Sequence, residues 1–505
     1  MPNSESLKIG QFISSLRKQK GLTQSGLAKQ LGTTQSVVAR MEKGQQNFST
    51  QTLAKISRIL NREIVTLSDE TINLKIEGGH KLSGKITTNS SKNAALGLMF
   101  ASLLNKGQTT LKNVPKIEEV FRISEVFESI GVNLSWEGNN LIIRPPKKFN
   151  LSRLNNKAAI KTRSVIMLMG SLAHFVREFS LPFAGGCKLG ERTVAPHLFA
   201  LEKLGIGIKT VHDHYQVKAL KLKPNSITLY EMGDTVTENA IFAAALIPGK
   251  TTIKLASANY MVQDVCLFLK GLGVEIEGLG TPLLTISGLN KIEQDYEFYV
   301  SEDPIESMMF LSLAAVTDSS IVIERCPVDF LELELLKLEK MGFKYKVLKQ
   351  YKSKNGFTNL ADIQTFPSRL NALDEKIHPL PSGFGVNIDN LPFFVPIAAK
   401  AFGKTLIHDW VYENRAIYYL ELNKLRANIT LLDAHRVIVE GPTELKGAEV
   451  ICPPALRPAV IILIAMLGAK GNSILRNVYS ISRGYEDLVS RLRSLGAKIE
   501  IMRGL

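Results

Sequence analysis

A single cysteine stands in a glycine-rich, basic stretch of the sequence, GGCKLGER at residues 185–192. Glycines let the backbone turn sharply and approach a ligand closely. The neighbouring Lys188 and Arg192 would lower the pKa of the Cys187 thiol and attract an anionic substrate. The stretch therefore indicates either a reactive cysteine that acts on a phosphorylated or carboxylated substrate or a basic loop with an idle thiol.

Other side chains suited to binding anions or moving protons recur along the chain. They are Lys92 and Asn93 after the first expected strands, Arg163 and Thr237 at the starts of apolar helices, Asp389 in a turn, and Arg415, Arg457 and Arg483 near the C-terminus. Lysine and arginine bind carboxylate and phosphate groups, and a carboxylate within hydrogen-bond reach can act as a general base. Each residue alone also fits a structural role, such as a surface ion pair or a turn cap.

A repeated pattern would position these residues. The end of an amphipathic helix, a small residue and a short alternating strand follow one another six times, starting at residues 129, 203, 271, 340, 424 and 494. The small residue is glycine except in the fifth copy, where it is Arg426. Glycine fits a helix C-terminus that needs a left-handed conformation. We therefore expect six compact α/β units, forming two lobes with a ligand cleft between them.

The first 68 residues differ from the rest in charge and in pattern. They hold ten Lys or Arg against three Asp or Glu, in a chain whose net charge is +15. Four amphipathic helices are expected, with Thr23 and Thr34 as caps of the second and third. Residues 16–44 resemble the Cro/C1-type (XRE) helix-turn-helix, which implies a dimer whose third helix reads DNA through Gln35, Ser36 and Arg40. A small helical interaction module without a DNA target is the alternative.

Length and composition exclude several classes of protein. The 505 residues, 45% of them hydrophobic, suffice for roughly three ordinary globular domains. No apolar run reaches the roughly 18 residues of a membrane span, and no signal peptide is evident. The four cysteines form no closely spaced pair, which argues against a disulfide framework or a zinc site. We expect a cytoplasmic protein that does not bind membranes.

Taken together, the segments that carry these residues resemble the UDP-N-acetylglucosamine enolpyruvyl transferases of the wider EPSP synthase-like family. The segments are SSKNAA (90–95), KTRS (161–164), GGCKLGER (185–192), TEN (237–239), Asp303 to Glu306, Asp389, ENR (413–415), LR (456–457) and RGYE (483–486). The resemblance covers residues 72–505. It implies an α/β (α+β) fold, a two-lobed inside-out α/β barrel of six repeated units preceded by a small all-α helix-turn-helix domain. The domains would be residues 1–68 and 72–505, with one lobe of about residues 91–300 and another of 72–90 plus 301–505.

The resemblance also implies a reaction and its residues. The enolpyruvyl group of phosphoenolpyruvate would pass to the 3-hydroxyl of UDP-N-acetylglucosamine, the first committed step of peptidoglycan precursor synthesis, with no metal or organic cofactor. Cys187 would protonate C3 or hold the enolpyruvyl group covalently, Asp389 would be the base, and Lys92 would also be catalytic. The phosphoenolpyruvate ligands would be Lys92, Arg192, Arg415, Arg457 and Arg483. The UDP-sugar ligands would be Asn93, Arg163, Arg192, Thr237 and Asp389.

The chain departs from the family pattern at three places, all on the acceptor side or next to the catalytic cations. Ala195 and Ala455 stand where the family usually has aspartates, and Asn259-Tyr260-Met261 replaces a pair of glutamates. Three hypotheses therefore stay open: an active transferase fused to a DNA-binding module, a transcription regulator that uses a weakened transferase fold as a ligand sensor, and a transferase with a different nucleotide-sugar acceptor.

Overall fold

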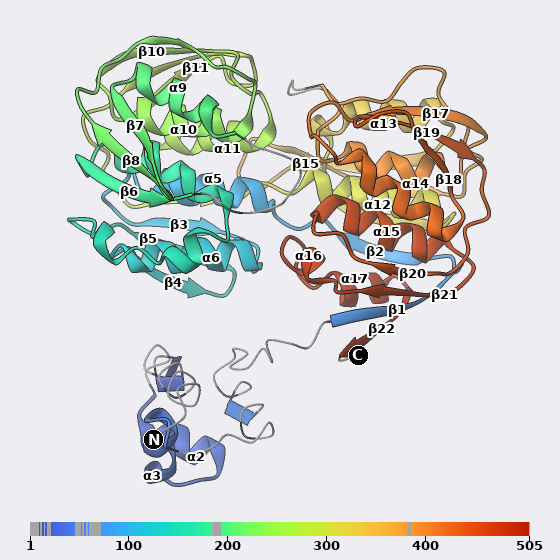
Figure 1. Ribbon diagram of the computed structural model, residues 1–505, viewed down its shortest axis with the longest axis horizontal. Helices are drawn as coiled ribbons and strands as arrows, with labels where there is room; N and C mark the ends of the chain where they lie inside the picture. Colours follow the sequence, from blue (N-terminus) through green and yellow to red (C-terminus); the bar gives the residue numbers. More distant parts are fainter. Residues whose placement is uncertain are drawn as a thin grey trace. The chain divides into compact units, whose positions relative to one another are not determined.

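The computed structural model describes residues 22–45, 72–183, 185, 193–380 and 385–503, together with residues 10, 13, 14, 16, 17, 52, 55, 56 and 59 (Figure 1). The chain divides into two compact units, one holding residues 1–72 and 503–505 and the other holding residues 73–502. Within the described residues, no helix is long and apolar enough to cross a membrane.

Two short helices with a tight turn form the centre of the first unit. They are α2 (Gln24–Leu31) and α3 (Gln35–Glu42), and residues of the flanking segments pack with them in a small core. The Thr23 hydroxyl caps α2 by accepting from the Gly26 N–H at 3.0 Å, as the sequence predicts. Thr34 occupies the cap position of α3, but its hydroxyl bonds the Ser36 side chain instead of a backbone N–H. Thr34 is therefore the N-cap residue of α3, as predicted, but its side chain makes no capping hydrogen bond.

A buried ion pair connects Glu42, at the end of α3, to Arg17 in the segment before α2. Arg17 Nε donates to Glu42 at 2.5 Å, and Gln24 and Ser14 each donate to the same carboxylate at 2.9 Å. Burial acts to raise the pKa of Glu42, but the hydrogen bonds from Arg17 and its other partners lower it below the ordinary value. The carboxylate is therefore ionised at neutral pH, and it fixes α3 against α2.

The second unit is built from small sheets with helices packed against them. Among the described residues there are six sheets, and each is open at both ends. Three of them use only strands between residues 109 and 299. One contains β3 (Thr109–Lys112), β4 (Asn133–Glu137), β5 (Asn140–Arg144) and β13 (Tyr296–Tyr299), and a second contains β6 (Glu178–Pro182), β7 (Ile206–Val211) and β8 (His214–Ala219). The third contains β9 (Ser226–Thr228), β10 (Gly249–Lys254), β11 (Glu275–Glu277) and β12 (Leu283–Gly288).

Of the other three sheets, two combine one of the first strands of this unit with strands after residue 319, and the third uses only strands between residues 403 and 441. They are β1 (Ile72–Gly78), β20 (Glu449–Ile451), β21 (Gly471–Arg476) and β22 (Lys498–Arg503); β2 (Ser83–Thr87), β14 (Ser320–Pro327), β15 (Lys344–Lys352) and β16 (Asn359–Phe366); β17 (Gly403–His408), β18 (Asn428–Leu431) and β19 (Arg436–Gly441). β1 runs antiparallel to β21, with Leu74 opposite Leu475. β2 runs parallel to β14, with Ile86 opposite Ile323.

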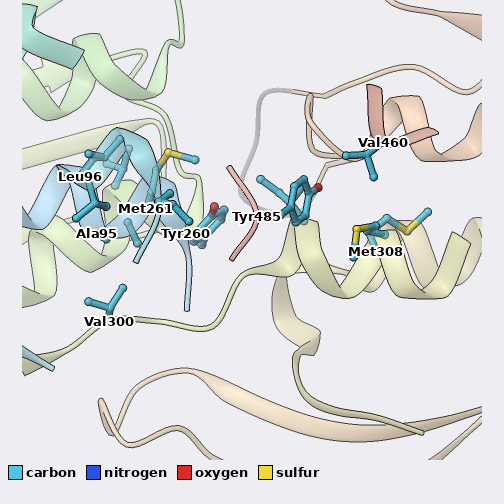
Figure 2. Close-up of a cluster of buried hydrophobic side chains, with 14 of the residues drawn as sticks. Ala95, Leu96, Tyr260, Met261, Val300, Met308, Val460 and Tyr485 are labelled. Carbon is cyan, nitrogen blue, oxygen red and sulfur yellow. The ribbon is translucent and has the colours of Figure 1, made fainter. Parts of the chain in front are cut away.

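Helices connect the strands and supply most of the core. The longer ones are α5 (Lys92–Ser102), α6 (Glu118–Ser129), α9 (Ala195–Lys203), α10 (Asp234–Ala245), α11 (Tyr260–Gly271), α12 (Pro304–Val316), α13 (Glu332–Lys340), α15 (Leu456–Gly468) and α17 (Leu488–Ser494). The short ones are α7 (Asn156–Ala159), α8 (Leu168–Leu172), α14 (Phe394–Ala398) and α16 (Tyr479–Ser482), with the 3-10 helices η1 (Leu151–Arg153), η2 (Arg163–Met167), η3 (Val328–Phe330), η4 (Leu391–Phe393) and η5 (Ala416–Leu425). α5, α10 and α11 pack together, and so do α12, α14 and α15 (Figure 1). Figure 2 shows part of the continuous core, with Leu96 from α5, Met261 from α11, Met308 from α12 and Val460 from α15.

Each of the six repeats seen in the sequence is a helix that ends one or two residues before a residue of left-handed conformation, which leads into a strand. The pairs are α6–β4, α9–β7, α11–β11, α13–β15, η5–β18 and α17–β22, and each strand belongs to a different sheet. The turn glycine has φ +100° at Gly131 and +95° at Gly496, while Arg426 adopts φ +68° in the fifth copy. The predicted six-unit α/β architecture is confirmed, because each repeat supplies one strand to one sheet.

Two segments of the second unit that are far apart in sequence lie side by side. Ser90 and Glu302 form an isolated antiparallel bridge. The Ser91 N–H donates to the Ser301 carbonyl and the Asp303 N–H donates to the Asn89 carbonyl, both at 2.8 Å. Residues 91 and 300, far apart in sequence, are therefore close together in space.

Candidate active site

A cavity of about 550 Å³ is lined by most of the described residues that the sequence predicts to be functional. Lys92 and Asn93 reach it from the start of α5, Arg457 from the start of α15, and Arg163 from η2. The loops before η4 and η5 and after α16 add Asp389, Arg415 and Arg483. Residues remote in sequence therefore converge on one cavity rich in cations, the setting expected for an anionic ligand.

Lys92 forms one side of this cation group. Its Nζ donates to Glu119 Oε2 at 2.9 Å, with both side chains mostly buried. Burial acts to raise the pKa of Glu119, but Lys92 and Arg483 lower it below the ordinary value. Within the described part of the chain, the Arg483 side chain makes no hydrogen bond or ion pair. Arg483 therefore acts on Glu119 through its charge alone, from within the same cavity.

Asp389 lies among three cations. Its carboxylate accepts from Arg457 Nη2 at 3.1 Å and lies 3.9 Å from Arg415 Nη1. Burial acts to raise the pKa of Asp389, but Arg457, Arg415 and Lys92 hold it below the ordinary value. Asp389 is therefore a carboxylate at neutral pH. The same Arg457 donates to the Tyr485 hydroxyl at 2.8 Å, which fixes its guanidinium.

Arg415 is held in position by Asp409, a residue that does not line the cavity. Its guanidinium donates twice to Asp409, at 2.5 Å from Nε and 2.8 Å from Nη2, and once to the Ile388 carbonyl at 2.8 Å. Tyr419 donates a further hydrogen bond to Asp409 at 2.6 Å. Arg415 and Asp409 are 1% and 0% exposed. This buried pair sets the position of Arg415 beside Asp389.

Comparison with known proteins identifies the architecture that carries this cavity. The family model described as EPSP synthase (3-phosphoshikimate 1-carboxyvinyltransferase) matches residues 76–492. The chain belongs to the EPSP synthase family. The family is one of carboxyvinyl transferases, so the predicted transferase class is confirmed. A helix-turn-helix model matches residues 13–67, which confirms the predicted N-terminal helix-turn-helix domain.

Several family members resemble the chain over nearly their whole length. The UDP-N-acetylglucosamine 1-carboxyvinyltransferase of Treponema denticola is 35% identical over 431 residues, which cover 84% of this chain and 98% of that protein. The protein of the same name from Borreliella burgdorferi is 32% identical with the same coverage. Among solved structures, the enolpyruvyl transferase NikO from Streptomyces tendae has a TM-score of 0.76 at 22% identity, covering 86% of this chain and all of that one. This last likeness confirms the fold.

The residues predicted to contact the UDP-sugar divide into three groups. Asn93, Arg163 and Asp389 line the cavity, and Arg163 Nη2 donates to the Thr193 carbonyl at 2.8 Å. Thr237 does not line it, because this fully buried hydroxyl donates to the Gly233 carbonyl and accepts from the Ser257 N–H. Thr235, one half-turn earlier in α10, reaches the cavity instead. Arg192 lies outside the described residues, and so does Cys187, which was predicted to be catalytic.

The departures from the family pattern have local structural effects. Ala455 is the cap residue of α15 and provides no side-chain acceptor to the helix N-terminus. Ala195 is the first residue of α9, and its N–H donates to the Thr193 hydroxyl at 3.1 Å. Asn259 caps α11, donates to Asp234 at 3.2 Å and accepts from Asn387 at 3.2 Å. Asn259 therefore bonds a cavity-lining residue from the segment after residue 301.

Several cavity residues were not predicted from the sequence. They include Glu119, His197, Glu231, Asp234, Glu238, Asn387, Trp410 and Tyr412. Glu119 stands in an acidic pair at the start of α6, which is a signal that could have suggested a partner for Lys92. Trp410 has no such signal, because only the folded position of its loop brings it to the cavity.

In the helix-turn-helix domain, the three residues predicted to contact DNA share one exposed surface of α3. Gln35, Ser36 and Arg40 are exposed, while Val38 and Met41 of the same helix are buried. Gln35 Nε2 donates to Gln24 Oε1 at 2.7 Å, which orients its side chain at the start of the helix.

Proposed function

We propose that the chain transfers the enolpyruvyl group of phosphoenolpyruvate to the 3-hydroxyl of UDP-N-acetylglucosamine and releases inorganic phosphate. The names of its 32–35% identical relatives support this reaction. The observation that carries the proposal is the arrangement of cations around one carboxylate: Lys92, Arg415 and Arg457 all lower the pKa of Asp389, and Arg483 lines the same cavity.

Phosphoenolpyruvate fits this cation group by charge. Its carboxylate and phosphate need several fixed donors, which arginine forks and a lysine ammonium provide. Arg483 forms no ion pair among the described residues, whereas Lys92 and Arg457 already pair with Glu119 and Asp389. The bound anion would compete for these two cations. It would thereby weaken their hold on Asp389 and move the pKa of its carboxylate back toward the ordinary value.

Asp389 then acts as the base in the addition step. The acceptor oxygen bonds to C2 of phosphoenolpyruvate while its proton passes to Asp389, and C3 takes up a proton from an acid. In the second step C3 loses a proton, the C2–C3 double bond re-forms, and the C2–O bond to phosphate breaks. The family resemblance assigns the acid to Cys187 and a further substrate cation to Arg192. On the acceptor side, Asn93 and Arg163 would hold the UDP-sugar.

A phosphate-release assay with phosphoenolpyruvate and UDP-N-acetylglucosamine tests this reaction. The wild type should release phosphate only when both substrates are present. Lys92→Ala should lower kcat/KM about 100-fold or more, because it removes a cation from the transition-state site. Lys85→Ala is the matched control, since Lys85 is an exposed lysine of β2 that does not line the cavity. Absence of phosphate release with UDP-N-acetylglucosamine and with a panel of other UDP-sugars refutes the proposal.

We further propose that residues 1–68 form a DNA-binding domain, that it forms a homodimer, and that residues 72–505 form the transferase, with lobes of 91–300 and of 72–90 plus 301–505. The exposed Gln35, Ser36 and Arg40 on α3 support DNA contact. Arg40→Glu should weaken binding of the full chain to duplex DNA in fluorescence anisotropy and reduce its salt dependence. Lys223→Glu, an equal charge change at an exposed transferase site, should not. Equal losses in both variants would mean that binding is nonspecific attraction to a basic protein.

A further inference from the structure

One large aromatic side chain on the cavity wall is partly exposed. Trp410 lines the cavity and is 44% exposed, although it follows the fully buried Asp409. None of the described aromatic rings stacks on it. The other tryptophan of the chain, Trp136, packs against Phe121 with ring centroids 5.9 Å apart.

The Trp410 indole is nevertheless held in a fixed orientation. Its Nε1 donates to the Pro379 carbonyl at 3.1 Å. The preceding residue is fixed through its backbone, because the Asp409 N–H donates to the His435 carbonyl at 2.7 Å and the Asp409 carbonyl accepts from His435 Nδ1 at 3.0 Å. The one polar atom of the ring is therefore satisfied, and the exposed part of the ring is apolar surface that a ligand can cover.

An exposed, oriented indole on the wall of a ligand cavity is suited to stacking. Leaving an apolar surface in water costs free energy that a ligand ring recovers when it covers the indole face. Indole does this without adding charge to a cavity that already contains several cations and carboxylates. Two parts of a nucleotide sugar have a suitable flat or apolar face: the nucleobase and the pyranose ring.

The loop that carries Trp410 also carries residues close to Asp389, which favours the pyranose ring. Trp410 lies five residues before Arg415, whose guanidinium is 3.9 Å from the proposed base Asp389. The ring that carries the reacting hydroxyl must bring that hydroxyl to Asp389. Glu413, in the same loop, also lines the cavity and provides a carboxylate that accepts from sugar hydroxyls.

We infer that Trp410 is the platform on which the sugar ring of the acceptor stacks, so that it determines acceptor specificity. The inference rests on the proposed transferase function, and it concerns only the acceptor. Trp410 is a positioning residue: it orients the sugar so that the 3-hydroxyl meets Asp389, and it does not contact phosphoenolpyruvate.

Fluorescence tests the contact directly, because the chain has two tryptophans. Trp136→Phe leaves Trp410 as the sole tryptophan, and titration with UDP-N-acetylglucosamine should change its emission in a saturable manner. The Trp410→Phe protein, which retains only Trp136, should show no change. N-acetylglucosamine 1-phosphate should reproduce the change and UDP should not. A change with UDP alone assigns the platform to the nucleobase and overturns the inference. The absence of a change with all three ligands overturns it as well.

Kinetics provide a second readout that a general folding defect would not reproduce. Trp410→Ala should raise KM for the sugar acceptor about tenfold and leave KM for phosphoenolpyruvate unchanged. Trp410→Tyr should restore most of the loss, since it keeps an aromatic face. Tyr230→Ala is the matched control, because Tyr230 is a 75% exposed aromatic residue that does not line the cavity. An unchanged acceptor KM in an active Trp410→Ala protein refutes the inference and leaves the transferase function intact. If no acceptor is turned over, the transferase function fails, while the fluorescence titration still reports on the contact.

Discussion

The buried pair of Arg415 and Asp409 should be essential to the stability of the transferase unit. The carboxylate of Asp409 accepts two hydrogen bonds from Arg415 and one from Tyr419, and both charged groups are almost fully buried. Asp409→Asn keeps the shape of the side chain and removes its charge. One of the two carboxylate acceptors becomes an amide donor that faces the guanidinium.

The expected cost follows from the uncompensated charge. Removing one partner of a buried ion pair typically costs about 3–5 kcal/mol, because the remaining charge stays desolvated. Arg415 keeps the Ile388 carbonyl at 2.8 Å and the more distant Asp389 at 3.9 Å. We therefore expect a loss near the lower end, about 3 kcal/mol in the free energy of unfolding. Arg415 would also turn toward Asp389, so activity should fall even where the protein stays folded.

Urea unfolding monitored by circular dichroism measures this loss. The matched control is Glu421→Gln, which neutralises one partner of the more exposed Lys424–Glu421 pair and should leave the midpoint almost unchanged. The double variant Asp409→Ala with Arg415→Met should be less destabilised than Asp409→Ala alone, since no buried charge is left unpaired. A loss below about 1 kcal/mol in Asp409→Asn, or a double variant as unstable as the sum of its single changes, refutes the reasoning.

Four further predictions concern other positions. Arg426→Gly should stabilise the protein by about 1 kcal/mol in urea unfolding, because Arg426 adopts φ +68°; a destabilised variant would contradict this. Ala455→Asp should stabilise by a similar amount of about 1 kcal/mol, since it supplies the missing cap of α15, and an unchanged midpoint would mean that the carboxylate does not reach the helix N-terminus. Burial raises the pKa of Asp264 to about 7, so the stability that this group contributes is present below pH about 4 and is lost as the pH rises through 7. The urea midpoint of the wild type should therefore be lower at pH 8 than at pH 5, and Asp264→Asn should abolish this difference. Burial raises the pKa of the three described thiols to about 12, and those residues are Cys266, Cys326 and Cys452. Iodoacetamide should therefore label the native protein at Cys187, and peptide mapping that finds label on the other three would contradict this.

The features predicted well from the sequence are those set by neighbouring residues. A helix end, a turn residue and an alternating strand lie within six positions, so the six helix–strand junctions can be recognised locally. Arg426 keeps its place in the pattern because the surrounding unit imposes the left-handed turn. Thr34 shows the limit of this approach, since the Ser36 hydroxyl competes for its side chain.

The candidate site was only partly predictable, because its geometry depends on distant segments. The motifs that contain Lys92, Arg457 and Arg483 identified residues that do line the cavity. Thr237 belongs to such a motif too, but its side chain points into the helix packing. Asp409 and Trp410 were missed because nothing in the local sequence indicates that the first is buried against Arg415 and the second is exposed in the cavity.

The strand pairing of the transferase unit sets the order in which it can be completed during synthesis on the ribosome. The three sheets between residues 109 and 299 use only strands from that stretch, so they can form as soon as it has emerged. β1 must wait for β21, about 400 residues later, because Leu74 pairs with Leu475. At about 10 residues per second, this first strand stays without its partner for roughly 40 seconds. A nascent chain that is released early therefore retains one finished half and an unpaired edge, the feature that chaperones bind and that drives aggregation.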